Sequence, residues 1–98
     1  MKPPVYLGDE VSAAGYRLAG ATVRIPQAGD ETATLAWART QAPLVLLSTS
    51  VAAGVDALAL RAALSALAPL ALVVPDLRGE SALPDLATRI RKQLGLDA

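Results

Sequence analysis

The side chains that could do acid–base, nucleophilic or metal chemistry are few in this 98-residue chain. Histidine and cysteine are both absent, which removes the commonest general base, the thiol nucleophile and the thiolate metal ligand. The remaining candidates are an acidic pair, Asp9 and Glu10, and a run of hydroxyls, Ser48, Thr49 and Ser50. Each group follows an apolar run that is typical of a buried strand. Ligands of α/β proteins bind at the carboxyl ends of parallel strands, so chemistry is expected at these positions.

Neither group completes a recognisable catalytic or binding motif. The acidic pair is one part of a response-regulator receiver, but Ser48 stands where the phospho-accepting aspartate is needed. The hydroxyls have no histidine to activate them, and a Ser–Lys pair would have only the distant Lys2 or Lys92. No glycine-rich phosphate loop and no metal-ligand spacing is present. We therefore expect a non-catalytic chain without a cofactor or a metal site. Asp9 is expected to cap the first helix and Gly20 to end it, and Thr49 or Ser50 is expected to cap the third helix.

Composition indicates one globular domain over residues 1–98. Hydrophobic residues make up 53% of the chain and charged residues 18%, and nine basic residues balance nine acidic ones. This balance argues against a nucleic-acid or anionic-membrane surface. No run is long enough to span a bilayer, and the N-terminal Met1-Lys2-Pro3-Pro4 lacks the apolar region of a signal peptide. These features predict a cytoplasmic protein with no direct membrane insertion.

Four strands and four helices are expected to position these residues. Three apolar runs are typical of strands covered on both faces, and a fourth run alternates like a strand at a sheet edge. The apolar runs lie at 5–7, 44–47 and 70–74, and the alternating run at 21–25. The expected helices lie at about 10–18, 30–41, 51–67 and 84–94. Because strands alternate with helices, we predict an α/β, flavodoxin-like (Rossmann-like) three-layer fold, with a four-stranded parallel sheet in the order 2-1-3-4 and a C-terminal helix.

The predicted helices differ in how clearly they show a buried face. The first has a thin apolar stripe, and its Gly15 indicates either close packing on the sheet or a flat surface for a partner. The third is apolar on two sides, and only one of them can face the sheet. In the second helix, Trp37 lies off the apolar stripe and is either a packing residue or a partner anchor. The expected stripes are Val11, Ala14, Gly15 and Leu18 in the first helix, Leu35, Ala38 and Ala42 in the second, and Val51, Val55, Leu58 and Ala62 opposite Leu60, Leu64 and Leu67 in the third.

The segment from Gly8 to Gly20 resembles the signature of a known family. An early strand leads into Gly-Asp, then Ser12, then the run Gly15-Tyr16-Arg17-Leu18-Ala19-Gly20. This arrangement is similar to the N-terminal signature of the F subunit of V-type and archaeal-type (V/A) rotary ATPases. The resemblance extends over most of the chain, as far as the closing Leu94-Gly95, although Tyr16 stands where the family more often has Phe.

The resemblance implies a non-catalytic central-stalk (rotor) component of an ATP-hydrolysing or ATP-synthesising complex that transports protons or other ions. Such a component binds the coiled-coil D subunit and transmits torque between the catalytic head and the membrane-ring adaptor. It lies in the cytoplasm, peripheral to the membrane through the complex. The alternative that the residues leave open is a stand-alone flavodoxin-like regulatory or small-ligand-binding domain.

The resemblance places the partner-binding residues on the first helix and on the C-terminal helix, residues 81–98. They are Arg17, Leu86, Ile90, Arg91 and Leu94. The apolar stripe of the C-terminal helix can dock on the chain's own sheet or on the D subunit, and the resemblance favours the D subunit. In that case deletion from Ser81 onward leaves a folded body, residues 1–80, with weakened stalk binding.

Overall fold

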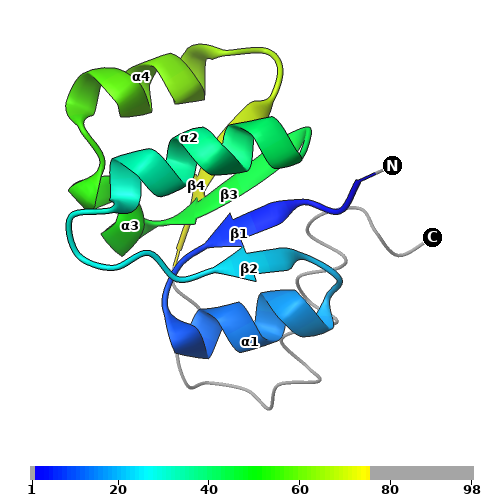
Figure 1. Cartoon of the computed structure of the whole chain (residues 1–98). Coiled ribbons are helices and arrows are strands. Elements are labelled where there is room, and N and C mark those ends of the chain that lie inside the picture. Colours follow the sequence, from blue (N-terminus) through cyan, green and yellow to red (C-terminus); the bar gives the residue numbers. More distant parts are fainter. Residues whose placement is uncertain (1, 76–98) are drawn as a thin grey trace.

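Four parallel strands and four helices make up residues 2–75, the part of the chain that the computed structural model describes. The strands are β1 (Val5–Leu7), β2 (Thr22–Arg24), β3 (Leu44–Ser48) and β4 (Leu70–Val74). The helices are α1 (Glu10–Leu18), α2 (Glu31–Gln41), α3 (Thr49–Gly54) and α4 (Ala57–Ser65). The strand order is β2-β1-β3-β4 (Figure 1). The predicted α/β, flavodoxin-like architecture and strand order are confirmed, while the predicted C-terminal helix lies outside the described residues.

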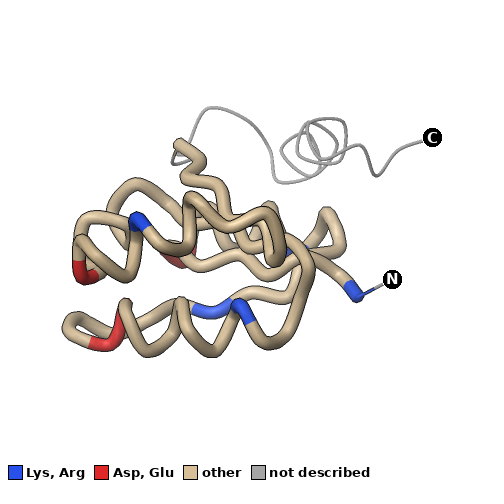
Figure 2. The backbone as a smooth tube through the Cα atoms, turned by 90° about the horizontal axis from the view of Figure 1, so that it is seen from above, with Lys and Arg blue, Asp and Glu red and all other residues tan. Residues whose placement is uncertain are grey.

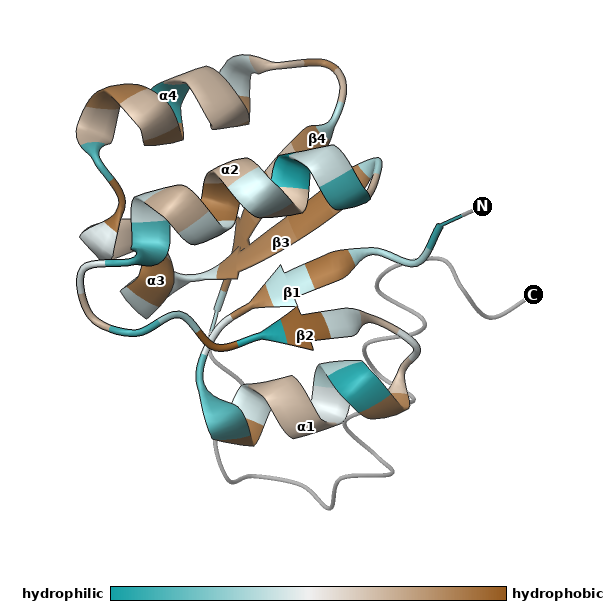
Figure 3. Cartoon of the chain, in the orientation of Figure 1, coloured by the Kyte–Doolittle hydropathy of each residue, from teal (hydrophilic) through white to brown (hydrophobic). Residues whose placement is uncertain are grey.

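The helices form one layer on each face of the sheet. The α2, α3 and α4 helices lie on one side and α1 on the other (Figure 1). Successive strand residues point to opposite faces, so Leu46 and Leu47 on β3 belong to different cores. The central strand is apolar over most of its length because both of its faces are covered (Figure 3).

Two hydrophobic cores result, and they differ in composition. The α2-side core is aliphatic and consists of Val5, Leu7, Leu35, Ala38, Ala42, Val45, Leu47, Val51, Val55, Ala63 and Ala71. The α1-side core contains two aromatic rings and consists of Tyr6, Ala13, Tyr16, Ala19, Ala21 and Leu46. On β2, Thr22 and Arg24 are exposed and Val23 is half-buried, as predicted for a strand at the sheet edge.

Both ends of α1 are closed as the sequence predicted. The Asp9 carboxylate accepts a hydrogen bond from the Ser12 N–H at 3.3 Å and caps the N-terminus. At the other end Gly20 has a φ of 105°, a left-handed conformation that glycine adopts at little cost. The Ala21 N–H then donates to the Tyr16 carbonyl at 3.0 Å, which completes a Schellman motif.

The face of α1 that is buried differs from the predicted stripe. Val11 and Leu18 are 52% and 50% exposed, whereas Tyr16 is 2% exposed. The Tyr16 ring stacks on Tyr6 of β1, with ring centroids 3.9 Å apart and an interplanar angle of 11°. The stripe prediction was wrong because the aromatic ring faces the sheet and rotates the aliphatic side chains away. Gly15 is buried beside this face, as close packing requires.

The predicted single helix over 51–67 is two helices. It breaks after Gly54, and the Asp56 carboxylate caps α4 by accepting a hydrogen bond from the Ala59 N–H at 3.2 Å. The chain changes direction at this break, so neither predicted apolar side of one long helix survives. Leu58 is 77% exposed and Leu67 95% exposed.

The cap of α3 also differs from the prediction. The hydroxyl of Ser48, the last residue of β3, accepts a hydrogen bond from the Val51 N–H at 3.2 Å. The predicted caps, Thr49 and Ser50, lie inside the first turn instead. The helix therefore starts directly where the strand ends, with no connecting residue.

Candidate functional site

The carboxyl ends of β1 and β3 bring the polar groups singled out in the sequence to one edge of the sheet. These two strands are paired, so the residues that follow them are neighbours. A shallow hollow of about 280 Å³ lies here, where this class of fold binds ligands. It is lined by Gly8, Asp9, Ile25, Pro26, Ala28, Glu31, Ser50 and Val51.

The polar side chains at this edge bond to nearby backbone or to one another. Asp9 caps α1 and Ser48 caps α3, and the Ser48 and Ser50 hydroxyl oxygens are 3.0 Å apart. The Glu31 carboxylate accepts a hydrogen bond from the Gly29 N–H at 2.8 Å in the turn before α2. Helix capping is thus one role of these side chains, as predicted for Asp9, while Ser48 caps α3 in place of the predicted Thr49 or Ser50.

The backbone at the end of β1 also packs closely on a side chain. A Cβ added at Gly8 would overlap the ring of Tyr6, so a side chain at residue 8 would require the ring to move. The Gly8 N–H donates to the Arg24 carbonyl at 3.2 Å and extends the pairing of β1 with β2. Gly8 therefore serves the packing of the α1-side core as well as the pairing of β1 with β2.

Charge is distributed unevenly between the two ends of the described body. Its acidic residues all lie at or next to helix N-termini, which the helix dipole favours. They are Asp9, Glu10, Asp30, Glu31 and Asp56. Figure 2 shows acidic positions gathered toward the end of the molecule away from Lys2. This arrangement disfavours an anionic ligand, such as a phosphate, at the carboxyl edge.

Within residues 2–75, no three acidic side chains come together in a way that could hold a metal ion. Over the same residues, no helix has the length and apolar character needed to cross a bilayer.

Arg17 lies in the last turn of α1 and is exposed. Its charge is favoured there by the negative end of the helix dipole. Among the described residues it forms no ion pair, and its neighbour Tyr16 points into the α1-side core. The structure thus places Arg17 on the outer surface.

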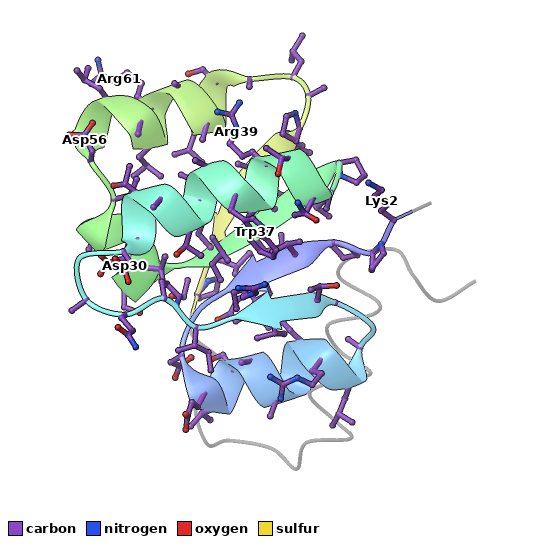
Figure 4. All side chains as sticks on the ribbon, in the orientation of Figure 1. Lys2, Asp30, Trp37, Arg39, Asp56 and Arg61 are labelled. Carbon is purple, nitrogen blue, oxygen red and sulfur yellow. The ribbon has the colours of Figure 1, made fainter. Side chains whose placement is uncertain are left out.

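Trp37 and Arg24 form a contact that sequence reasoning did not identify. The Arg24 guanidinium carbon lies 4.2 Å from the centre of a Trp37 ring. Trp37 is half-buried on α2, packs against the α2-side core and faces the sheet (Figure 4). Trp37 is therefore a packing residue at the β2 edge. The alternation at 21–25 predicted that Arg24 lies on one face of β2. It did not predict that the guanidinium lies above the indole ring of Trp37.

Exposed apolar side chains gather in two other places on the described surface. On α4, Leu58 and Leu64 are exposed beside Arg61, next to a shallow hollow of about 320 Å³. On β4, Leu70 and Leu72 are 43% and 45% exposed. These surfaces are apolar or weakly charged, which is typical of interaction surfaces rather than of catalytic sites.

The remaining candidates from the sequence, Leu86, Ile90, Arg91 and Leu94, lie outside the described residues. Comparison with protein-family models finds no match to this chain, and comparison with curated proteins finds none either. The fold and the surface of residues 2–75 are therefore the basis of the functional argument below.

Proposed function

We propose that this chain is a non-catalytic interaction protein, the F subunit in the central stalk of a V/A-type rotary ATPase. In this role it binds the coiled-coil D subunit and transmits torque between the catalytic head and the adaptor of the ion-translocating membrane ring. The observation that carries the proposal is the structure of the signature segment, Gly8 to Gly20. That segment forms a capped helix that presents Arg17 outward.

The uneven charge of the body supports an interaction role over the alternative of a stand-alone ligand-binding domain. Flavins and nucleotides carry phosphates, which would have to approach the carboxyl edge of the sheet. The hollow at that edge is lined by the carboxylates of Asp9, which caps α1, and Glu31, which accepts a hydrogen bond from the Gly29 N–H. A phosphate there would meet like charge on these carboxylates.

Arg17 is suited to fix the orientation of a partner helix. A guanidinium can donate two parallel hydrogen bonds to one carboxylate, a geometry that lysine cannot reproduce. On the proposed surface Arg17 pairs with an acidic side chain of the D subunit. Arginine is enriched among the residues that dominate the binding energy of protein interfaces.

The direct test mixes the full-length chain with the coiled-coil D subunit encoded in the same genome. We expect a 1:1 complex on size exclusion, with a dissociation constant measurable by calorimetry. Arg17→Ala should weaken binding by about tenfold, and Arg17→Lys nearly as much, because the bidentate contact is lost in both. The control is Arg61→Ala, which removes an exposed arginine from α4 and should leave the dissociation constant unchanged.

The opposite results identify the alternative function. A failure to form the complex, together with micromolar binding of a flavin or of Mg-ATP by the isolated chain, would establish a ligand-binding domain. If Arg17→Ala leaves the binding of the D subunit unchanged, the stalk function is retained and the contact lies elsewhere on the surface.

A further inference from the structure

Another shallow hollow lies on the α2 side of the sheet, between the end of β2 and the start of α2. It is lined by Arg24, Asp30, Ala33, Thr34 and Trp37. Its residues from α2 and the N-cap of that helix lie three or four positions apart and therefore share one helix face. Figure 4 shows Asp30 at the start of α2 and Trp37 further along, on the side toward the sheet. We call this hollow the Arg24–Asp30 site.

The two charged side chains of the site have no hydrogen-bond or ion-pair partner among residues 2–75. The Arg24 guanidinium contacts the Trp37 ring and no carboxylate. Asp30 stands at the N-cap of α2, but its carboxylate accepts no hydrogen bond from the helix. At the equivalent positions of α1 and α4, Asp9 and Asp56 each accept one from a backbone N–H. The Asp30 carboxylate is therefore available to a ligand, which the other two N-cap carboxylates are not.

The ring contact prepares Arg24 for binding. Its guanidinium carbon lies 4.2 Å from the centre of the Trp37 ring, which restricts the motion of an otherwise exposed side chain. An aromatic ring attracts the charge of a guanidinium but is not a conventional acceptor for its five N–H donors. These donors can therefore hold a carboxylate through two parallel hydrogen bonds.

We propose that the Arg24–Asp30 site binds a small zwitterion of the α-amino acid class. The ligand carboxylate accepts hydrogen bonds from Arg24, and the ligand ammonium group donates to Asp30. Its side chain lies against Trp37 and Ala33, which supply the apolar part of the lining. A simple anion would be repelled by Asp30 and a simple cation by Arg24, so a ligand that carries both charges fits best.

The size of the hollow agrees with this ligand class. Its volume is about 270 Å³, just below the range of about 300–1,000 Å³ that is typical of sites for drug-sized ligands. The inference goes beyond the proposed stalk function and does not depend on it, because Arg17 lies on α1, on the other face of the sheet. Binding of an amino acid and binding of the D subunit are measured separately, so either can fail alone.

A series of three compounds tests the charge requirement in the full-length chain. The probe is L-leucine, and the comparison compounds are N-acetyl-L-leucine, which lacks the ammonium group, and L-leucinamide, which lacks the carboxylate. Trp37 is the single tryptophan, so its fluorescence reports binding directly. We expect a saturable change with leucine, with a dissociation constant on the order of 1 mM, and binding at least about tenfold weaker for the other two. No saturable change with leucine, or equal binding of all three compounds, would overturn the proposal.

Two variants assign each charge to its residue. Arg24 and Asp30 are exposed, so Arg24→Gln and Asp30→Asn should both leave the protein folded. We expect Asp30→Asn to bind leucine and N-acetyl-leucine equally, and Arg24→Gln to bind leucine and leucinamide equally. The chemical shift of the Trp37 indole N–H follows each titration from the variant's own starting spectrum. The control, Glu10→Gln, removes an exposed carboxylate from α1 and should bind as the wild type does. Wild-type discrimination among the three compounds in both site variants would overturn the proposal.

Discussion

The two faces of the sheet are packed in different ways, and this difference affects how well the buried side of a helix could be predicted from the sequence. On the α2 side, aliphatic side chains from three helices interdigitate with β1 and β3. On the α1 side, α1 is the one helix within residues 2–75 that lies on the sheet, and the stacked rings of Tyr6 and Tyr16 fill the space between them. An aliphatic core tolerates several helix orientations, whereas a stacked aromatic pair fixes one.

The largest expected effect on stability compares the two faces of the sheet at adjacent residues of β3. Leu46 and Leu47 are adjacent on β3, both are 0% exposed, and they point to opposite cores. We expect Leu47→Ala to lower the free energy of unfolding by about 3–5 kcal/mol and Leu46→Ala by about 2–3 kcal/mol. Among the described elements, three helices enclose the α2-side core and limit its collapse around the cavity, whereas α1 alone covers the other face and can shift. Urea unfolding measures both values, and a larger cost for Leu46→Ala would reverse this ranking of the two faces.

An intermediate effect concerns the tyrosine pair and appears only at high pH. Burial raises the pKa of Tyr16 above its ordinary value of 10. Below pH 10 the phenol is neutral in both folded and unfolded chains, so its contribution to stability is constant. As the pH rises further, the unfolded chain loses this proton first, and the free energy of unfolding falls by at most about 1.4 kcal/mol per pH unit.

Replacement of the phenol isolates this contribution. Tyr16→Phe keeps the ring in the α1-side core and should flatten the decrease in stability between pH 10 and 11, measured by urea unfolding. At pH 8 the comparison of the two proteins gives the cost of removing the hydroxyl alone. Parallel curves for wild type and variant through pH 11 would show that the Tyr16 phenol titrates in the folded protein as it does in the unfolded chain.

The smallest expected effect lies at the border of the α2-side core. Arg24→Ala removes the guanidinium above the Trp37 ring and should lower the free energy of unfolding by about 0.5–1 kcal/mol. Trp37 is the single tryptophan of the chain, so its fluorescence maximum reports the change directly. Arg61→Ala on α4 is the matched control and should alter neither quantity. An unchanged Trp37 spectrum in Arg24→Ala would show that the two side chains are not in contact in solution.

The sequence by itself determined the parts of this protein that depend on near neighbours in the chain. Three apolar runs predicted the buried strands, the alternating run at 21–25 predicted the edge strand, and the alternation of strands with helices predicted parallel pairing. Asp9 and Gly20 fixed the ends of α1, because the bonds that close a helix join residues two to five positions apart. The N-terminus of α3 was predicted only to within one or two residues, because Ser48 caps it and not Thr49 or Ser50.

Only the tertiary structure decided which helix face is buried and where the third helix breaks. The rotation of α1 depends on the Tyr6 ring on another element, which outweighs the aliphatic stripe of Val11 and Leu18. The break at Gly54 and Asp56 lets α3 and α4 both pack on the sheet, although the apolar pattern continues through it. The Arg24–Trp37 contact joins a strand to the helix that follows it. Local patterns record how apolar a segment is, but the partner that covers it is set by residues distant in sequence, whose packing selects one orientation from several of similar local energy.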